Sequence, residues 1–157
     1  MDIAVHQQEI QTLLEASEEF FILTQGKPPS INAAHAFFTD LPFNKSLDDK
    51  LCLGVFQQKE LVGIIDLIKS YPKPDVWFLG LLLIHPTFRY KHLGKDIMFE
   101  LEQALIKEDV QTLRLAIIQE NDSGYQFWQK IGYTLKKKQP YKVADKDTEV
   151  YVMSKRL

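Results

Sequence analysis

The chain contains a single cysteine, Cys52, and this scarcity excludes two kinds of structure. One thiol forms neither an intramolecular disulfide framework nor a cysteine-based zinc site, and we expect no metal ion. Cys52 lies inside the apolar stretch 51–56. A thiol in such a setting is expected to be buried and structural rather than nucleophilic.

Long hydrophobic runs and a strong charge bias are also missing. No apolar stretch approaches the roughly 18 residues of a membrane span. The first ten residues lack the basic and apolar regions of a signal peptide, which favours a cytoplasmic protein. The formal net charge is −2 at pH 7. This balance gives no bulk attraction to nucleic acid or to an anionic membrane, so we expect neither as a partner, and any anion site must be local.

Apolar periodicity predicts one α/β (α+β) domain for the 157 residues. The expected helices are 7–17, 30–41, 93–106 and 122–131, and 20–23 is either a helix end or a strand. The expected strands are 51–57, 61–71, 76–85, 112–119, 133–138 and 148–154. This order predicts a central mixed β-sheet of roughly six to seven strands flanked by about four helices. Strands 76–85 and 112–119, joined through a helix, should be parallel.

Residues 81–96 carry the strongest functional signal. An apolar run ends at His85-Pro86, and a helix begins near Gly94. A helix N-terminus presents free backbone N–H groups and the positive end of the helix dipole, which together favour phosphate. Arg89, Lys91 and Lys95 add positive charge at the same corner. The segment therefore predicts capture of a diphosphate-bearing ligand.

Two common phosphate loops do not fit this segment. A Walker A loop would need glycine at the position of Arg89 and Ser or Thr at the position of Asp96. A dinucleotide fingerprint needs three spaced glycines, and this turn has one.

The spacing Arg89-x-x-His92-x-Gly94 instead resembles the Gln/Arg-x-x-Gly-x-Gly/Ala signature of the GCN5-related N-acetyltransferase (GNAT) superfamily. His92 takes the place of the first glycine. The block at 121–133, Asn-x-x-Gly-Tyr-x-Phe-Trp-x-Lys-x-Gly-Tyr, is similar to the second motif of that superfamily, Asn-x-x-Ala-x-x-Phe-Tyr-x-Lys-x-Gly-Phe. The two blocks occur in the order and at the separation usual for the family, and the resemblance covers roughly residues 50–157.

This resemblance implies acetyl-CoA as cosubstrate, bound in a V-shaped cleft between the two parallel central strands. The turn would bind the diphosphate through Arg89, Tyr90, Lys91, His92, Leu93, Gly94 and Lys95. The pantetheine arm would contact Leu82, Ile84, Asn121, Phe127 and Trp128. The backbone N–H groups of Leu82 and Ile84 would also polarise the thioester carbonyl.

The catalytic acid and base depart from the family pattern. Trp128 occupies the position where the family often has a tyrosine that protonates the leaving thiolate, and an indole cannot do this. Gly80 occupies the position of a glutamate that many relatives use as the base. Asp66 is the alternative base, because it is the only charge in the apolar run 61–68. His85 is a weaker candidate, and structural pairing of Asp66 remains open.

The predicted function is direct transfer of an acetyl group from acetyl-CoA to a primary amine. The alternative is a non-catalytic module of the same fold that binds or senses acyl-CoA. Residues 1–50 would form a helical part over the acceptor site, and 51–157 the cofactor-binding core. The sequence leaves open whether the acceptor is a small molecule or a protein, and whether the chain is a monomer or a homodimer.

Overall fold

The computed structural model describes residues 1–89 and 92–157. Its helices are α1 (Ile3–Ala16), α2 (Glu18–Gln25), α3 (Ala33–Thr39), α4 (Leu93–Lys107) and α5 (Asp122–Lys130), with short 3-10 turns at Leu47–Asp49 and Pro86–Phe88. Its strands are β1 (Lys50–Gln57), β2 (Glu60–Ile68), β3 (Val76–Ile84), β4 (Thr112–Ile118), β5 (Thr134–Val143) and β6 (Lys146–Arg156).

The strands form one mixed sheet of six in the order β1-β2-β3-β4-β6-β5, within the described residues. Pairing of β3 with β4 is parallel and all other pairings are antiparallel. The predicted fold class is therefore confirmed. The same residues contain five α-helices rather than about four, because the ambiguous segment 20–23 belongs to α2.

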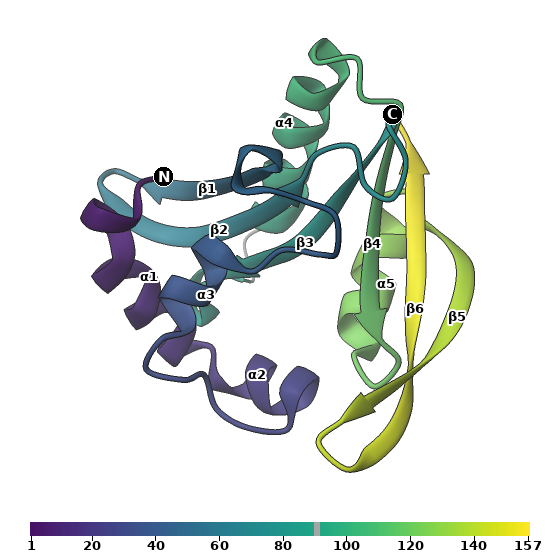
Figure 1. Ribbon diagram of the computed structural model, residues 1–157. Coiled ribbons are helices and arrows are strands. Elements are labelled where there is room, and N and C mark those ends of the chain that lie inside the picture. Colours follow the sequence, from purple (N-terminus) through teal and green to yellow (C-terminus); the bar gives the residue numbers. More distant parts are fainter. Residues whose placement is uncertain (90–91) are drawn as a thin grey trace.

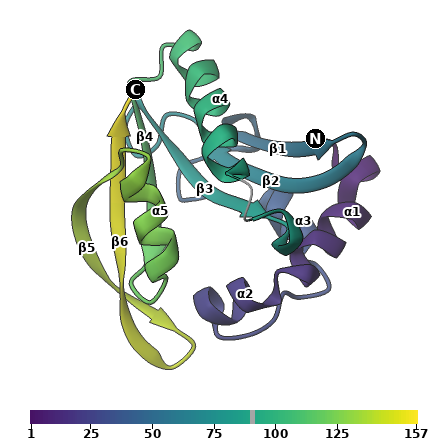
Figure 2. The ribbon, with the colours of Figure 1, turned by 180° about the vertical axis from the view of Figure 1, so that it is seen from behind.

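Helices cover the two faces of the sheet unequally. Helices α1 to α3 lie over β1 to β3 on one face (Figure 1), and α4 and α5 lie on the other (Figure 2). Ile10, Leu13 and Leu14 follow one side of α1 and are buried against β2 residues such as Ile64. A second cluster, which includes Met98 of α4, lies between α4, α5 and the sheet. Within the described residues, no helix lies over the face of β4, β6 and β5 opposite α5.

A β-bulge at Gly80 shapes the centre of the sheet. Asp66 of β2 pairs with Leu81, and the next residue, Leu67, pairs with Leu79, so Gly80 is the extra residue in β3. Pairing of β3 with β4 ends at the same place, with Leu79 opposite Leu115. A bulge bends its strand and increases its twist. Beyond this point β3 and β4 separate, as Figure 1 shows. Residues of both strands line a cavity there, at the place of the predicted V-shaped cleft.

Several element boundaries differ from the sequence predictions. Helix α1 begins at Ile3 rather than at residue 7, and β2 ends at Ile68 rather than at residue 71. Helix α3 begins at Ala33, because Ser30 accepts a hydrogen bond from the N–H of Asn32, two residues on, in a turn that precedes the helix. The β5–β6 hairpin is longer than predicted at both strands. Its outer strand is exposed and includes Pro140, which an edge strand tolerates. Among the described residues no helix is both long and apolar enough to cross a membrane.

Candidate functional site

A cavity of about 890 Å³ occupies the open end of the cleft. Its walls come from α2, β3, the start of α4, β4 and α5. Of the predicted site residues, those lining it are Leu82, Ile84, Arg89, His92, Gly94, Lys95, Asn121, Phe127 and Trp128. Leu93 and Asp66 are not in its lining, and Tyr90 and Lys91 lie outside the described residues. Phe20 and Thr24 of α2, which the sequence did not single out, also line it.

The edge of β3 that faces the cleft offers backbone donors. The N–H of His85 donates to the carbonyl of Val62 on β2 at 2.8 Å. Backbone groups alternate between the two edges of a strand, so the N–H groups of Leu82 and Ile84 point to the opposite edge. The β3–β4 register does not extend to these two residues within the described chain. Both predicted residues therefore present N–H groups to the cleft, the arrangement needed to bind an extended amide-containing arm.

The first turn of α4 supplies the second group of donors. The carbonyl of His92 accepts from the N–H groups of Lys95 and Asp96. The first N–H groups of a helix have no intrahelical acceptor, so those of Leu93 and Gly94 are available at this end. The exposed Lys95 adds a positive charge. The turn thus combines backbone donors, the helix dipole and a cation, as an anion site requires.

His92 takes the place of a glycine in the family motif, and its backbone adopts the left-handed conformation that glycine favours, with φ 57° and ψ 5°. This region costs a non-glycine residue roughly 1–2 kcal/mol. We expect His92→Gly to raise the free energy of unfolding by about 0.5–1 kcal/mol, measured by urea denaturation. His92→Ala is the matched control, because it removes the imidazole but keeps the Cβ. An equal gain in both variants would contradict a backbone origin.

Arg89 is held by groups on the α1–α2 side of the turn. Its Nε donates to the carbonyl of Ile84 at 2.8 Å and its Nη2 to the hydroxyl of Ser17 at 3.2 Å. Its Nη1 forms an ion pair with Glu19. The pKa of Glu19 is lowered, since the hydrogen bond and charge of Arg89 outweigh the opposing effect of burial. Arg89 therefore links the turn to the N-terminal helices, and its contact with a diphosphate remains a prediction.

Helix α5 forms the opposite wall of the cleft. Asn121 caps this helix, with its Oδ1 accepting from the N–H of Gly124 at 3.0 Å. The capping role and the predicted ligand contact are compatible, because the amide nitrogen is not used by the cap. A Cβ built on Gly94 would lie 3.2 Å from the ring of Phe127. A side chain at residue 94 would therefore require the Phe127 ring to shift by a few tenths of an ångström.

No tyrosine is among the described residues that line the cleft. Trp128 is buried, with its ring centroid 5.1 Å from that of Tyr133. The hydroxyl of Tyr133 lies behind Trp128 and donates to Glu102 at 3.0 Å, while Lys155 binds the same carboxylate. Burial and the Glu102 charge raise the pKa of Tyr133. This phenol is therefore not placed to protonate a leaving group in the cleft.

Asp66 occupies the space that a side chain at position 80 would need. A Cβ built on Gly80 would lie 2.7 Å from Oδ2 of Asp66. The other carboxylate oxygen, Oδ1, accepts from Nζ of the buried Lys50 at 2.7 Å. Burial raises the pKa of Asp66 despite this partner. A carboxylate from β2 thus stands beside the bulge of β3, where the resemblance implied a glutamate.

The sequence did not identify Lys50 as a residue of the site, because a lysine at the start of a strand normally faces solvent. Its Nζ also donates to the carbonyl of Asp40 at 2.9 Å, which ties β1 to the end of α3. Cys52, two residues on, donates to the carbonyl of Phe37. Burial raises the pKa of this thiol to about 11, so it is protonated at neutral pH and is not a nucleophile.

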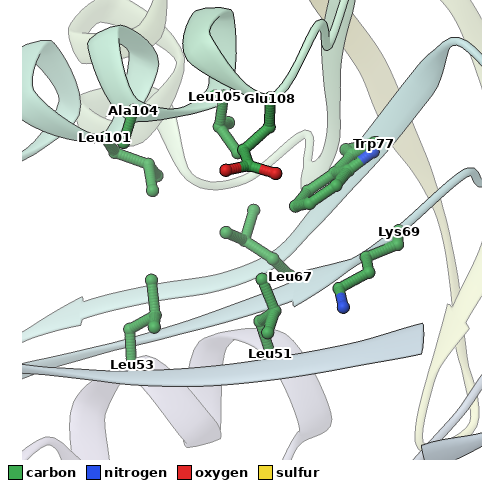
Figure 3. Close-up of a pocket in the computed structure, with 9 residues that line it drawn as sticks. All are labelled: Leu51, Leu53, Leu67, Lys69, Trp77, Leu101, Ala104, Leu105 and Glu108. Atoms are coloured by element: carbon green, nitrogen blue, oxygen red, sulfur yellow. The ribbon is translucent and has the colours of Figure 1, made fainter. Parts of the chain in front are cut away.

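A second and smaller cavity, of about 280 Å³, lies between α4 and strands β1 to β3. Figure 3 shows leucines of α4 facing leucines of the strands across it, with Lys69 and Glu108 beside them. None of the predicted site residues lines this cavity. Among the described residues no cluster of three His, Cys, Asp or Glu side chains is placed to hold a metal ion.

The chain is similar to known proteins in both sequence and fold. The family model described as "Acetyltransferase (GNAT) family" matches residues 10–133, including N-terminal residues that the motif comparison left unmatched. A spermidine N(1)-acetyltransferase of Thermoplasma acidophilum is 30% identical over 108 residues. The match covers 69% of this chain but only 60% of that relative, less than two thirds of its length.

Two solved structures show the same fold. An acetyltransferase from Thermus thermophilus has a TM-score of 0.76 at 18% identity, covering 97% of this chain and 91% of that one. The PaiA N-acetyltransferase from Thermoplasma acidophilum, solved in complex with coenzyme A, has a TM-score of 0.69 at 20% identity, covering 100% and 96%.

Proposed function

The chain belongs to the GNAT family of acetyltransferases, and we propose that it transfers an acetyl group from acetyl-CoA to a primary amine. The observation that carries this proposal is the position of the cavity. It brings together the open edge of β3 and the N-terminus of α4, the two donor sets that an amide-containing arm and its diphosphate need. The coenzyme A in the T. acidophilum structure supports this choice of cosubstrate.

Each step of the reaction has a candidate group in the chain. Acetyl-CoA supplies a thioester, whose carbonyl carbon is attacked by the neutral amine. The N–H groups of Leu82 and Ile84 stabilise the negative charge that develops on the carbonyl oxygen. Asp66 accepts the proton that the amine nitrogen loses, directly or through water. The thiol leaves as thiolate and takes a proton from solvent, because a thiol pKa of roughly 8.5 makes an unassisted departure feasible.

We propose that helix α2 covers the part of the cleft that binds the acceptor amine. Phe20 and Thr24 project from it into the lining of the cleft. We therefore assign residues 1–50 to the acceptor site and 51–157 to the cosubstrate. The name of the T. acidophilum relative makes polyamines one acceptor class to test.

Calorimetric titration with acetyl-CoA tests the proposed cosubstrate, with ATP and NAD as competing diphosphate ligands. We expect selective, saturable binding that Gly94→Trp abolishes, because the indole would displace Phe127 from the cleft wall. The matched control is Phe99→Trp on the exposed side of the same helix, where 59% of the residue is accessible. The proposal is wrong if acetyl-CoA does not bind the native chain, or if ATP and NAD bind equally well.

The second candidate function is a non-catalytic acyl-CoA sensor, and the lack of a tyrosine in the described cleft lining favours it. Release of free thiol from acetyl-CoA in the presence of a panel of amines separates the two functions. Acceptor-dependent release supports the enzyme. Tight binding without release at any amine concentration supports the sensor.

A further inference from the structure

Arg114 lies on the face of the sheet that helices α1 to α3 partly cover, close to the β-bulge at Gly80. Its neighbours along β4, Leu113 and Leu115, belong to the core cluster that includes Met98 of α4. Side chains alternate along a strand, so Arg114 points to the opposite face. That face also carries Asp66, since Ile64, two residues before it, packs against α1.

The guanidinium of Arg114 has no partner to neutralise it within the described chain. Its Nε is buried and makes no hydrogen bond, and the residue forms no ion pair. The facing residues on the flanking strands are Phe78 and Ser154, neither of which is acidic. An arginine is always charged, and a half-buried one is normally paired. A buried donor without an acceptor calls for a group that the chain itself does not supply.

Two charges on the β6–β5 side of Arg114 are also positive. Arg156 is opposite Thr112, two residues before Arg114 on the same face. Lys137 is opposite Val152, two residues from Ser154 on the neighbouring strand. Helices α1 to α3 cover the β1–β3 half of this face and leave the β4–β6–β5 half open (Figure 1). The open half thus presents a positive surface beside the proposed reaction site.

One small acceptor molecule could span the distance from Arg114 to the Gly80 bulge. Phe78 is in register with Arg114, and Gly80 is two residues farther along β3. With strands about 4.8 Å apart and a rise of about 3.3 Å per residue, the Cα atoms of Arg114 and Gly80 are separated by roughly 8 Å. Consider an acceptor molecule whose amine lies beside Gly80 and Asp66. If roughly three to five methylene groups separate that amine from an anionic group, the anionic group would reach the guanidinium of Arg114.

We infer that the acceptor carries a carboxylate, which Arg114 binds while the amine lies beside the Asp66 carboxylate at the Gly80 bulge. This rests on the proposed acetyltransferase function and narrows its acceptor to ω-amino acids. Arginine binds a carboxylate through two parallel hydrogen bonds, a geometry that lysine cannot reproduce. The same cation repels the second ammonium group of a diamine.

The test compares three acceptors of matched length: 5-aminopentanoate, n-pentylamine and 1,5-diaminopentane. We expect kcat/KM for 5-aminopentanoate to exceed that for n-pentylamine by about ten- to a hundredfold. Arg114→Gln should remove this preference, mainly by raising KM for 5-aminopentanoate. Arg114→Lys should keep part of the preference for 5-aminopentanoate, because it keeps the positive charge. A misfolded variant would not keep this preference. Arg156→Gln is the control on the same face and should have a small effect.

Direct binding distinguishes this inference from the proposed function. Titration of 5-aminopentanoate into coenzyme A-loaded protein should show binding that Arg114→Gln weakens at least tenfold. Such binding without any turnover supports the carboxylate site and refutes acetyl transfer. Turnover of n-pentylamine or 1,5-diaminopentane at least as fast as 5-aminopentanoate refutes the carboxylate site and supports acetyl transfer. An equal loss for all three acceptors in Arg114→Gln also refutes the inference.

Discussion

Asp66→Asn is expected to lower kcat by roughly 10²- to 10⁴-fold, the usual contribution of a general base. The amide keeps an oxygen that can accept from Lys50, so the contact at 2.7 Å survives while the proton acceptor is lost. Acetyl-CoA affinity, measured by calorimetry, should be unchanged, because Asp66 does not line the cofactor cleft. A variant that retains more than a tenth of the activity would exclude Asp66 as the base.

The bulge offers a sharper form of this test. Because a side chain at position 80 would occupy the space of the Asp66 carboxylate, the base can be moved from β2 to β3. We expect Gly80→Glu alone to lower activity by steric conflict. The double variant Asp66→Ala/Gly80→Glu should recover at least tenfold over Asp66→Ala. A purely structural role for Asp66 predicts no recovery of kcat, even if the double variant is as stable as the native chain.

The second large effect concerns stability. Lys50→Met is expected to lower the free energy of unfolding at pH 7 by about 3–5 kcal/mol, because it leaves the buried carboxylate of Asp66 without its cation. The side chain of Lys50 is only 2% exposed, and that of Asp66 18%. The double variant Lys50→Met/Asp66→Leu should recover most of the loss, since it removes both charges. Urea denaturation measures all three proteins.

A surface pair provides the control. Lys142 and Asp147 form an ion pair at 3.4 Å with side chains 68% and 85% exposed. Lys142→Met should leave stability nearly unchanged, because solvent screens an exposed pair. Comparable losses at the two sites would contradict the importance assigned to burial.

The loss in Lys50→Met should depend on pH. Burial raises the folded-state pKa of Asp66, and removal of Lys50 takes away the hydrogen bond and charge that lower it. Below the unfolded pKa of about 3.9, Asp66 is protonated in both states and the loss should be small. As the pH rises from there to the folded pKa, the unfolded state releases its proton first, so the free energy of unfolding falls. It levels off above the folded pKa. A loss that instead grows toward low pH would contradict this account.

Local sequence patterns were sufficient for most of the elements, including the start of α4, which follows the predicted diphosphate turn. The run 76–85 and the stripe of Leu93, Ile97, Leu101 and Leu105 predicted a strand and a helix, which the structure contains as β3 and α4 with ends within one or two residues. Periodicity succeeds here because burial on one face or both fixes which positions are apolar. The exposed β5 strand lacked such a pattern, and its length was underestimated.

The long-range contacts around the proposed site could not be predicted from the sequence. Lys50 and Asp66 are 16 positions apart, and Arg89 reaches Ser17 and Glu19 across 70 positions or more. Such pairs depend on strand register and helix packing, which the patterns of a single sequence do not predict. The Gly80 bulge is a further example, because it exists only in the pairing of β3 with β2.

By itself, the sequence determined the fold class, the start of α4 and the residue types of the cleft, because these follow from local periodicity and from motif spacing within short segments. Only the tertiary structure decided which carboxylate stands beside the Gly80 bulge and which arginine lacks a partner among the described residues. Both depend on how neighbouring strands are aligned. A shift of one residue in that register would turn each side chain to the other face of the sheet.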